Sequence, residues 1–219
     1  MIEESKKYAT QDQALADEIT AARQLIISVR DDPEIAPLVA VRGLDADKLA
    51  EGLGLQETTQ ITFNGRQEAM AGQVQATAAL EEVDASAWQT YQDFRATGRA
   101  FFTNPAARLA LSLSGNTPRD RQKFITHVSA SYAAARLEPY QATFAGAGYP
   151  LEALDAAQAT LEALIAADQV QDAAIAAAKQ ATADRDAAGK VLRQWVRQLK
   201  TVAKIALRNR PDLADRLQL

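Results

Sequence analysis

Apolar residues recur every three or four positions near the start of the chain, a spacing that places them on one face of an α-helix. This pattern predicts a helix over residues 8–30. The helix is expected to end before Asp32 and Pro33, because an aspartate can cap the following helix and a proline can begin it. The predicted apolar face consists of Leu15, Ile19, Ala22, Ile26 and Val29.

The same pattern returns later in the chain at an offset of 106 positions. Four of the five positions of the apolar face are again apolar or aromatic, whereas Leu15 is matched by the charged Arg121. The likeness is poorer in the middle, where Gly43 pairs better with Gly148 and a small insertion or deletion is required. On the apolar face, Ile125 matches Ile19, Val128 matches Ala22, Tyr132 matches Ile26 and Ala135 matches Val29. Near the ends of the two stretches, Pro211 matches Pro105, Leu217 matches Leu111 and Leu219 matches Leu113.

We interpret this likeness as a diverged tandem duplication, with repeat units at residues 8–113 and 114–219. The alternative is a chance likeness between two alanine-rich helical stretches. The same elements are predicted in each unit: a helix of about six turns, a short piece broken by proline or glycine, a long helical region, a third amphipathic helix, and a short helix after a proline. The predicted fold is therefore all-α: two tandem pseudo-symmetric helical-bundle repeats of about 106 residues packed together, or a single fused bundle.

Breaks are expected within both long helical regions. In the first unit, Asn64 and Gly65 are typical of a helix break. In the long region of the second unit, Gly189 is the only glycine or proline. The region is therefore expected to form long helices with a reversal near residues 168–172 or 183–189.

The composition excludes several classes of protein. The chain has no cysteine, which excludes disulfides, thiolate metal sites and thiol nucleophiles. No stretch approaches the ~20 consecutive apolar residues of a membrane-spanning helix, so we expect no transmembrane segment. The N-terminal residues carry acids where a signal peptide carries bases, which favours a cytoplasmic location. The net charge of -4 argues against nonspecific nucleic-acid binding by the molecule as a whole.

No arrangement of catalytic residues, cofactor motif or metal ligands is recognisable in the sequence. The single histidine, His127, has no second histidine or Glu-x-x-His pattern at helical spacing, so a structural or solvent-facing role is expected. Gly52 and Gly54 belong to a GLGL stretch that lacks the third glycine and the preceding strand of a dinucleotide fold. We therefore expect a noncatalytic protein that needs no cofactor or metal.

The most distinctive surface predicted from the sequence is a row of bases on the last long helix. Six lysines and arginines step by three and four, and no acidic residue occurs between residues 187 and 211. In a protein of net negative charge, this is a local concentration of positive potential. The six residues of this basic stripe are Lys190, Arg193, Arg197, Lys200, Lys204 and Arg208.

Three interpretations of the basic stripe remain open. The first is a solvated helix face, partly neutralised by Glu152, Asp155 and Glu162. The second is a docking face for an acidic protein surface, including that of another copy. The third is contact with nucleic-acid phosphates or an anionic membrane surface. Two features count against the third: Trp195 lies on the apolar face rather than among the bases, and a bundle needs that apolar face as core.

Leucines on the short helices that follow the prolines form a second candidate surface. They must pack on their own bundle, which is the commoner arrangement, or on a partner. We therefore expect a noncatalytic helical scaffold or protein-interaction protein that self-associates. The alternative is a nucleic-acid or anionic-surface binding module that uses the basic stripe. The candidate leucines are Leu111, Leu113, Leu217 and Leu219.

Overall fold

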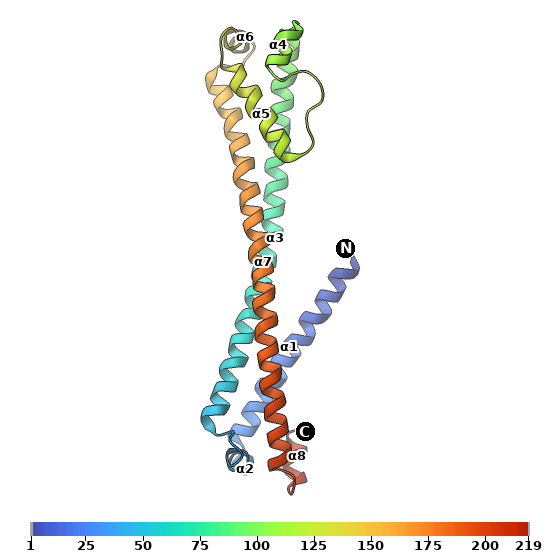
Figure 1. Cartoon of the computed structure of the whole chain (residues 1–219), viewed down its shortest axis with the longest axis vertical. Helices are drawn as coiled ribbons and strands as arrows, with labels where there is room; N and C mark the ends of the chain where they lie inside the picture. Colours follow the sequence, from blue (N-terminus) through green and yellow to red (C-terminus); the bar gives the residue numbers. More distant parts are fainter. Residues whose placement is uncertain (1, 219) are drawn as a thin grey trace. The chain divides into compact units, whose positions relative to one another are not determined.

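The computed structural model describes the backbone of residues 2–218 and the side chains of residues 12–218, and over this range the chain forms helices and no strand (Figure 1). The prediction of an all-α protein is therefore confirmed. None of the helices in residues 2–218 combines the length and the apolar character that crossing a bilayer requires. The helices are α1 (Ile2–Asp31), α2 (Ile35–Ala40), α3 (Ala46–Phe101), α4 (Pro105–Ala110), α5 (Arg121–Ala135), α6 (Tyr140–Gly146), α7 (Leu151–Ala206) and α8 (Pro211–Arg216).

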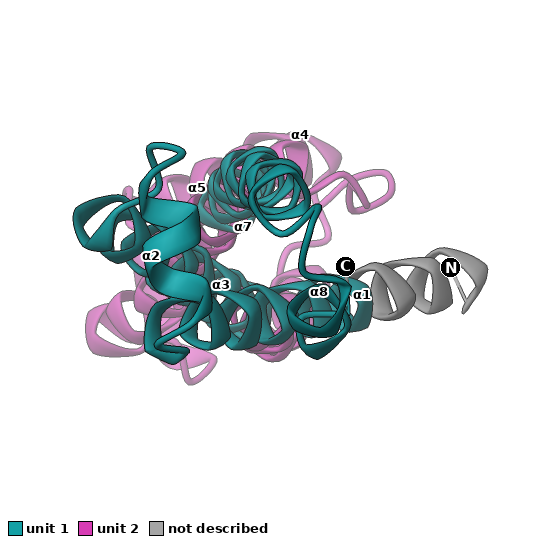
Figure 2. Ribbon diagram, turned by 90° about the horizontal axis from the view of Figure 1, so that it is seen from below, with its two compact units in different colours: residues 1–71, 177–219 teal, residues 72–176 magenta. Residues whose placement is uncertain are grey.

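The chain divides into two compact units, coloured separately in Figure 2. Unit 1 contains residues 1–71 and 177–219, and unit 2 contains residues 72–176. Unit 1 therefore combines α1, α2 and the start of α3 with the end of α7 and α8. Unit 2 combines the end of α3 and α4 with α5, α6 and the start of α7.

The core of unit 1 forms where the apolar face of α1 meets α3 and α7. All five predicted apolar positions of α1 are buried, so this part of the pattern is confirmed. Ile26 and Val29 pack in one cluster with Leu49 of α3 and Leu199 of α7. Trp195 joins the same cluster and is also buried. Burying apolar side chains of this size stabilises the fold by roughly 1.5–3 kcal/mol each.

The core of unit 2 is richer in aromatic rings. Phe94 of α3 stacks on Phe144 of α6 with ring centroids 4.8 Å apart, and its edge meets Tyr132 of α5 at 5.0 Å. Leu111 and Leu113, which follow α4, are completely buried in the same cluster. Offset-stacked and edge-to-face pairs contribute about 0.5–1.5 kcal/mol beyond the area they bury, so these rings fix how α3, α5 and α6 pack together.

Both predicted breaks in the long helices are wrong. α3 continues through Asn64 and Gly65, and α7 continues through residues 168–172 and 183–189. A glycine inside a helix costs only about 1 kcal/mol relative to alanine, and neither region contains a proline. The side chain of Asn64 also forms a hydrogen bond within the helix: its Oδ1 accepts from Nε2 of Gln60, one turn earlier, at 3.0 Å. The long helices therefore extend without the expected reversal.

The predicted cap between the first two helices is confirmed. Asp32 Oδ1 accepts hydrogen bonds from the backbone N–H groups of Glu34 at 2.9 Å and Ile35 at 3.1 Å. The pKa of Asp32 is lowered, chiefly by the hydrogen bond from the Glu34 N–H group, and also by those from Ile35 and Arg216. Partial desolvation of the carboxylate acts in the opposite direction. The cap fixes the turn after α1 and so places α2 at the end of unit 1.

Candidate functional site

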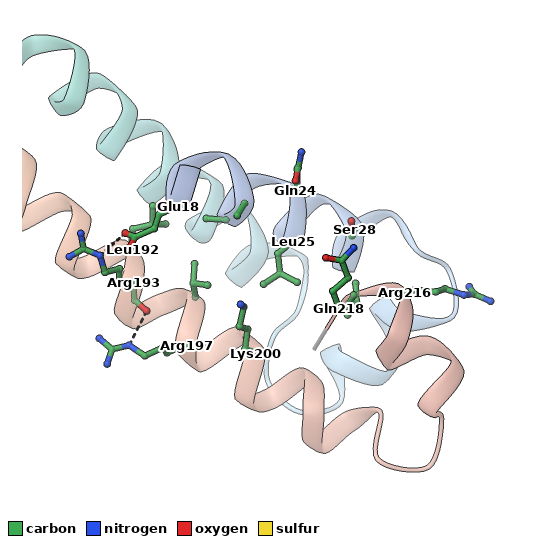
Figure 3. A pocket seen from close by; sticks show the side chains of 14 residues that line it. Glu18, Gln24, Leu25, Ser28, Leu192, Arg193, Arg197, Lys200, Arg216 and Gln218 are labelled. Carbon is green, nitrogen blue, oxygen red and sulfur yellow. Dashed lines mark hydrogen bonds and ion pairs between the residues drawn. The ribbon is translucent and has the colours of Figure 1, made fainter. Parts of the chain in front are cut away.

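Unit 1 contains a groove of about 520 Å³ between α1 and the last part of α7, closed at one end by the residues around the end of α8 (Figure 3). We call it the cationic groove. Its volume lies within the range typical of ligand and peptide sites. It is lined by Glu18, Ala21, Ala22, Gln24, Leu25 and Ser28 of α1, by Leu192, Arg193, Val196, Arg197 and Lys200 of α7, and by Arg216, Leu217 and Gln218.

Small side chains create the hollow, and apolar side chains form its floor. Ala21 and Ala22 of α1 line the groove together with Val196 of α7, and these small side chains leave the space between the helices open. The buried Leu25, Leu192 and Leu217 complete the apolar lining. The sequence hides this feature, because alanines at these positions are equally typical of closely packed helices.

Positive charges surround the floor, and two of them already have carboxylate partners. Arg193 Nε donates to Glu18 Oε2 at 2.6 Å, and this pair joins the two walls of the groove (Figure 3). Arg216 Nη1 donates to Asp32 Oδ2 at 3.3 Å and to Glu34 Oε2 at 3.2 Å. In Figure 3 the guanidinium of Arg216 points away from the groove. These two bases are therefore largely neutralised.

The other two bases of the groove, Arg197 and Lys200, have no carboxylate partner among the described side chains. Arg197 Nε donates to the carbonyl oxygen of Arg193 at 3.2 Å. Neither residue forms a salt bridge with any carboxylate whose side chain is described in residues 12–218. Positive charge beside apolar surface is the combination that binds an acidic, partly apolar protein segment.

All six residues of the basic stripe are exposed, five of them on α7 and Arg208 in the turn that follows it. Only Arg193 pairs with a carboxylate among the described side chains, and that carboxylate is Glu18. Of the three acids expected to neutralise the stripe, Asp155 instead accepts from Arg136 Nη1 at 2.5 Å. The groove uses three members of the stripe, Arg193, Arg197 and Lys200, whereas Lys190, Lys204 and Arg208 lie outside its lining.

The three candidate leucines that the structure describes are buried, and Leu217 also contributes to the apolar lining of the cationic groove. Leu111 and Leu113 are completely buried in the core of unit 2, and Leu217 is 8% exposed in the core of unit 1. They pack on their own units because the turns after α4 and α8 direct them inward, which leaves Leu109 as the exposed leucine of α4. Leu219 lies outside the described residues.

His127 belongs to a small polar cluster in unit 2. Its Nε2 lies 2.7 Å from the hydroxyl oxygen of Tyr91, which is also 3.4 Å from Ser131 Oγ. Ser131 Oγ in turn donates to the carbonyl oxygen of Leu111 at 2.8 Å. Burial lowers the pKa of His127, and the charge of Arg95 lowers it further. The neutral imidazole can therefore accept from Tyr91, and no group of potential metal ligands occurs around it or elsewhere in the described residues.

A buried charge cluster in unit 1 was not foreseen from the sequence. Asp12 Oδ1 accepts from Arg185 Nη1 at 2.6 Å, and its Oδ2 accepts from Arg66 Nη1. The two arginine side chains are only 8% and 6% exposed. The signal that could have revealed the cluster is heptad spacing, because Arg185 lies seven residues from the buried Ala178 and from the buried Leu192.

The described residues contain a second hollow, of about 550 Å³, which lies in unit 2 and is lined by Trp88, Gln92, Arg95, Asn116, Thr117 and Arg119. The cationic groove differs from it in its apolar floor of leucine, valine and alanine side chains. Comparison with protein-family models, with curated proteins and with solved structures gives no match for this chain. Its function must therefore be inferred from the cationic groove and from the arrangement of the helices.

Proposed function

We propose that the chain is a noncatalytic helical interaction protein that binds an acidic protein surface through the cationic groove. The observation that carries the proposal is the position of Arg197 and Lys200 beside the apolar floor, with no carboxylate partner among the described side chains. Bases of this kind attract and orient an acidic partner, while burial of its apolar side chains supplies affinity. A scaffold role fits this chemistry because binding requires no reactive group.

We further propose that the chain consists of two tandem repeats at residues 8–113 and 114–219, and the helix lengths support this. α3 and α7 both contain 56 residues. α4 and α8 both contain 6 residues, and each begins with a proline. Each compact unit then combines the first half of one repeat with the second half of the other.

The turns and the burial pattern support the duplication as well. Gly43, which follows α2, has a φ of 87°, and Gly148, which follows α6, has a φ of 90°. This left-handed conformation favours glycine. The Gly43 N–H donates to the carbonyl of Ala40 at 2.9 Å, and the Gly148 N–H donates to that of Ala145 at 3.3 Å. At an offset of 105 positions, buried residues repeatedly coincide, for example Leu49 with Leu154, Ala87 with Leu192, and Phe94 with Leu199.

A second candidate function is binding to nucleic acid or another anionic surface through the whole basic stripe. The exposure of all six bases favours it. This function predicts that affinity falls steeply with salt, because phosphate contacts release counterions. It also predicts that bases of the stripe inside and outside the groove contribute equally to the binding affinity.

The two functions are separated by two probes and two double variants. The probes are a fluorescent decaglutamate peptide and a single-stranded DNA of ten nucleotides, each titrated with the full-length protein. We expect decaglutamate to bind the wild-type protein. The double variant Arg197→Gln with Lys200→Gln should bind it about tenfold more weakly, which corresponds to a loss of about 1.4 kcal/mol in binding free energy. The matched control, Lys190→Gln with Arg208→Gln, removes the same charge outside the groove and should leave binding within about twofold. Equal losses in both double variants, with tighter binding of DNA, would favour the anionic-surface function.

A further inference from the structure

We propose that the cationic groove binds a non-helical acidic segment of a partner protein, which runs antiparallel to α7. This inference rests on the proposed function and the proposed duplication, and it specifies the chemistry of the partner. The observation behind it lies within unit 2, where the chain's own non-helical segment, residues 114–119, is hydrogen-bonded along the face of α3 that corresponds to the groove face of α7. The segment and this face together line a hollow of about 550 Å³.

The two faces correspond at the offset of 105 positions that also aligns the ends of α3 and α7. The buried residues next to them, Leu199 in α7 and Phe94 in α3, coincide at the same offset. The groove residues and their counterparts are Arg193 with Trp88, Arg197 with Gln92 and Lys200 with Arg95.

In unit 2 the segment is held by side chains of α3. Arg99 Nη2 donates to the carbonyl oxygen of Gly115 at 3.0 Å, and Arg95 donates to the same oxygen. Further along, Gln92 Nε2 donates to Thr117 Oγ1 at 3.4 Å. Gly115 is bound by Arg99 and Arg95, whereas the later residue Thr117 is bound by Gln92, which comes earlier in α3. The segment therefore runs antiparallel to the helix. Its irregular backbone supplies the carbonyl oxygens that a helix would use internally.

In unit 1 the corresponding face is open and more basic. Lys200 stands in place of Arg95 and can still donate to a backbone carbonyl. Arg197 stands in place of Gln92, so its best partner is a carboxylate where the segment of unit 2 carries Thr117. These positions therefore define a register for the partner: a carbonyl opposite Lys200, followed two residues later by an acid opposite Arg197.

The remaining differences between the faces specify the rest of the partner. Arg193 replaces Trp88 and uses its Nε to bind Glu18, so its other guanidinium N–H groups are the donors for an acid at the position of Arg119. In unit 2, Trp88 fills the space toward α5 by stacking on Phe124, with ring centroids 5.2 Å apart. The groove has no such ring, and its apolar floor can receive a small apolar residue such as proline, which stands at position 118 in the segment of unit 2.

A peptide built on the segment of unit 2 tests this inference. The acetylated peptide SGNEPED keeps residues 114–120 but places acids where Thr117 and Arg119 stand. Its control is DEPENGS, which has the same composition and the opposite chain direction. By fluorescence anisotropy with the full-length protein, SGNEPED should bind at least tenfold more tightly than DEPENGS. Arg197→Gln should remove most of that difference, while the control substitution Lys190→Gln should leave it unchanged.

A charge exchange checks the register. Arg197→Glu should weaken SGNEPED at least tenfold and should restore binding to SGNKPED, whose lysine replaces the first acid. Arg197 is exposed, and circular dichroism of each variant verifies that the helices are intact. If decaglutamate binds the groove but SGNEPED binds no more tightly than DEPENGS, this inference is overturned and the proposed function stands. If none of these acidic peptides binds, both fail.

Discussion

Trp195 of α7 lies directly against the backbone of Gly52 in α3. A Cβ atom placed on residue 52 would be 2.2 Å from Cη2 of the indole ring, well inside any non-bonded carbon contact. The two helices can approach this closely because residue 52 has no side chain, which is why a glycine is retained inside a long helix. Trp195 thereby stays buried and joins α1, α3 and α7 in the core of unit 1.

We expect Gly52→Ala to destabilise the protein by about 1–3 kcal/mol, because the added methyl group forces the indole ring out of its site. Urea denaturation followed by circular dichroism measures the change. The matched control is Gly54→Ala in the same helix, where an added Cβ meets nothing within 4 Å. That substitution should stabilise the protein by up to about 1 kcal/mol through helix propensity. Equal effects at the two positions would contradict the close contact with Trp195.

Asp12 should be essential to the stability of unit 1. Its carboxylate is the acid that bridges the buried side chains of Arg66 and Arg185. Asp12→Asn keeps the shape of the side chain but removes the charge that Arg66 and Arg185 share. Arg185 then keeps only its pair with the largely exposed Asp186, so the substitution should cost up to about 3–5 kcal/mol. The control is Asp17→Asn on the exposed face of α1, which should stay within about 0.5 kcal/mol. Chemical denaturation of both variants at neutral pH measures the difference, and similar stabilities would show that the cluster contributes little.

Stability should fall as the pH drops below about 6.5, because of His127. The unfolded imidazole has a pKa of about 6.5, whereas burial lowers the pKa of His127 in the folded protein. The unfolded state therefore binds the proton more readily, and its population rises as the pH falls through this range. The contribution of the neutral histidine is fully present above about pH 6.5 and is lost toward the lower folded pKa.

The pH effect can be measured from urea denaturation between about pH 5.5 and 7.5, above the range in which carboxylates titrate. His127→Gln should remove the dependence, since the chain contains no other histidine. An NMR titration of the wild-type imidazole gives the folded pKa directly. A midpoint at or above that of a model peptide would contradict the prediction.

We expect the full-length protein to self-associate at low salt. A duplicated chain resembles a homodimer whose subunits have been joined, and the basic stripe can meet acidic surface on a second copy of this net negative protein. Size-exclusion chromatography with light scattering should give a mass above 23.6 kDa at low salt and a smaller mass at moderate salt. Arg208→Gln with Lys204→Gln should reduce association. A mass of 23.6 kDa at both salt concentrations would contradict self-association.

The sequence predicted the parts of the fold that depend on local chemistry. The buried face of α1, the cap at Asp32 and the helices after Pro105 and Pro211 all follow from spacing and from capping preferences. The predicted breaks at Gly65 and Gly189 were wrong because the cost of one glycine is small beside the packing of a long helix. Local propensity thus located the helix ends at caps and prolines but overestimated the effect of isolated glycines.

The candidate site was predicted only in part. The spacing of Arg197 and Lys200 was sufficient to place both on one exposed face of α7. Nothing in the sequence shows that the alanines of α1 lie opposite them, because that depends on the packing of segments far apart in the chain. The same limit applies to Asp12, whose partners Arg66 and Arg185 are distant in sequence and become neighbours only in the folded unit.

The division of the chain between the two units has a consequence for the order of folding. Unit 2 is one continuous stretch of chain, whereas unit 1 must bring together two stretches that flank it. Within unit 2, Gln171 Nε2 donates to Thr77 Oγ1 at 3.2 Å, which holds its first and last helical segments close together. Once unit 2 has folded, the two stretches of unit 1 are tethered near each other and avoid most of the entropy of closing a long loop. We therefore expect unit 2 to fold first. Mutations that slow its folding should delay unit 1 as well, while damage to unit 1 should leave unit 2 able to form.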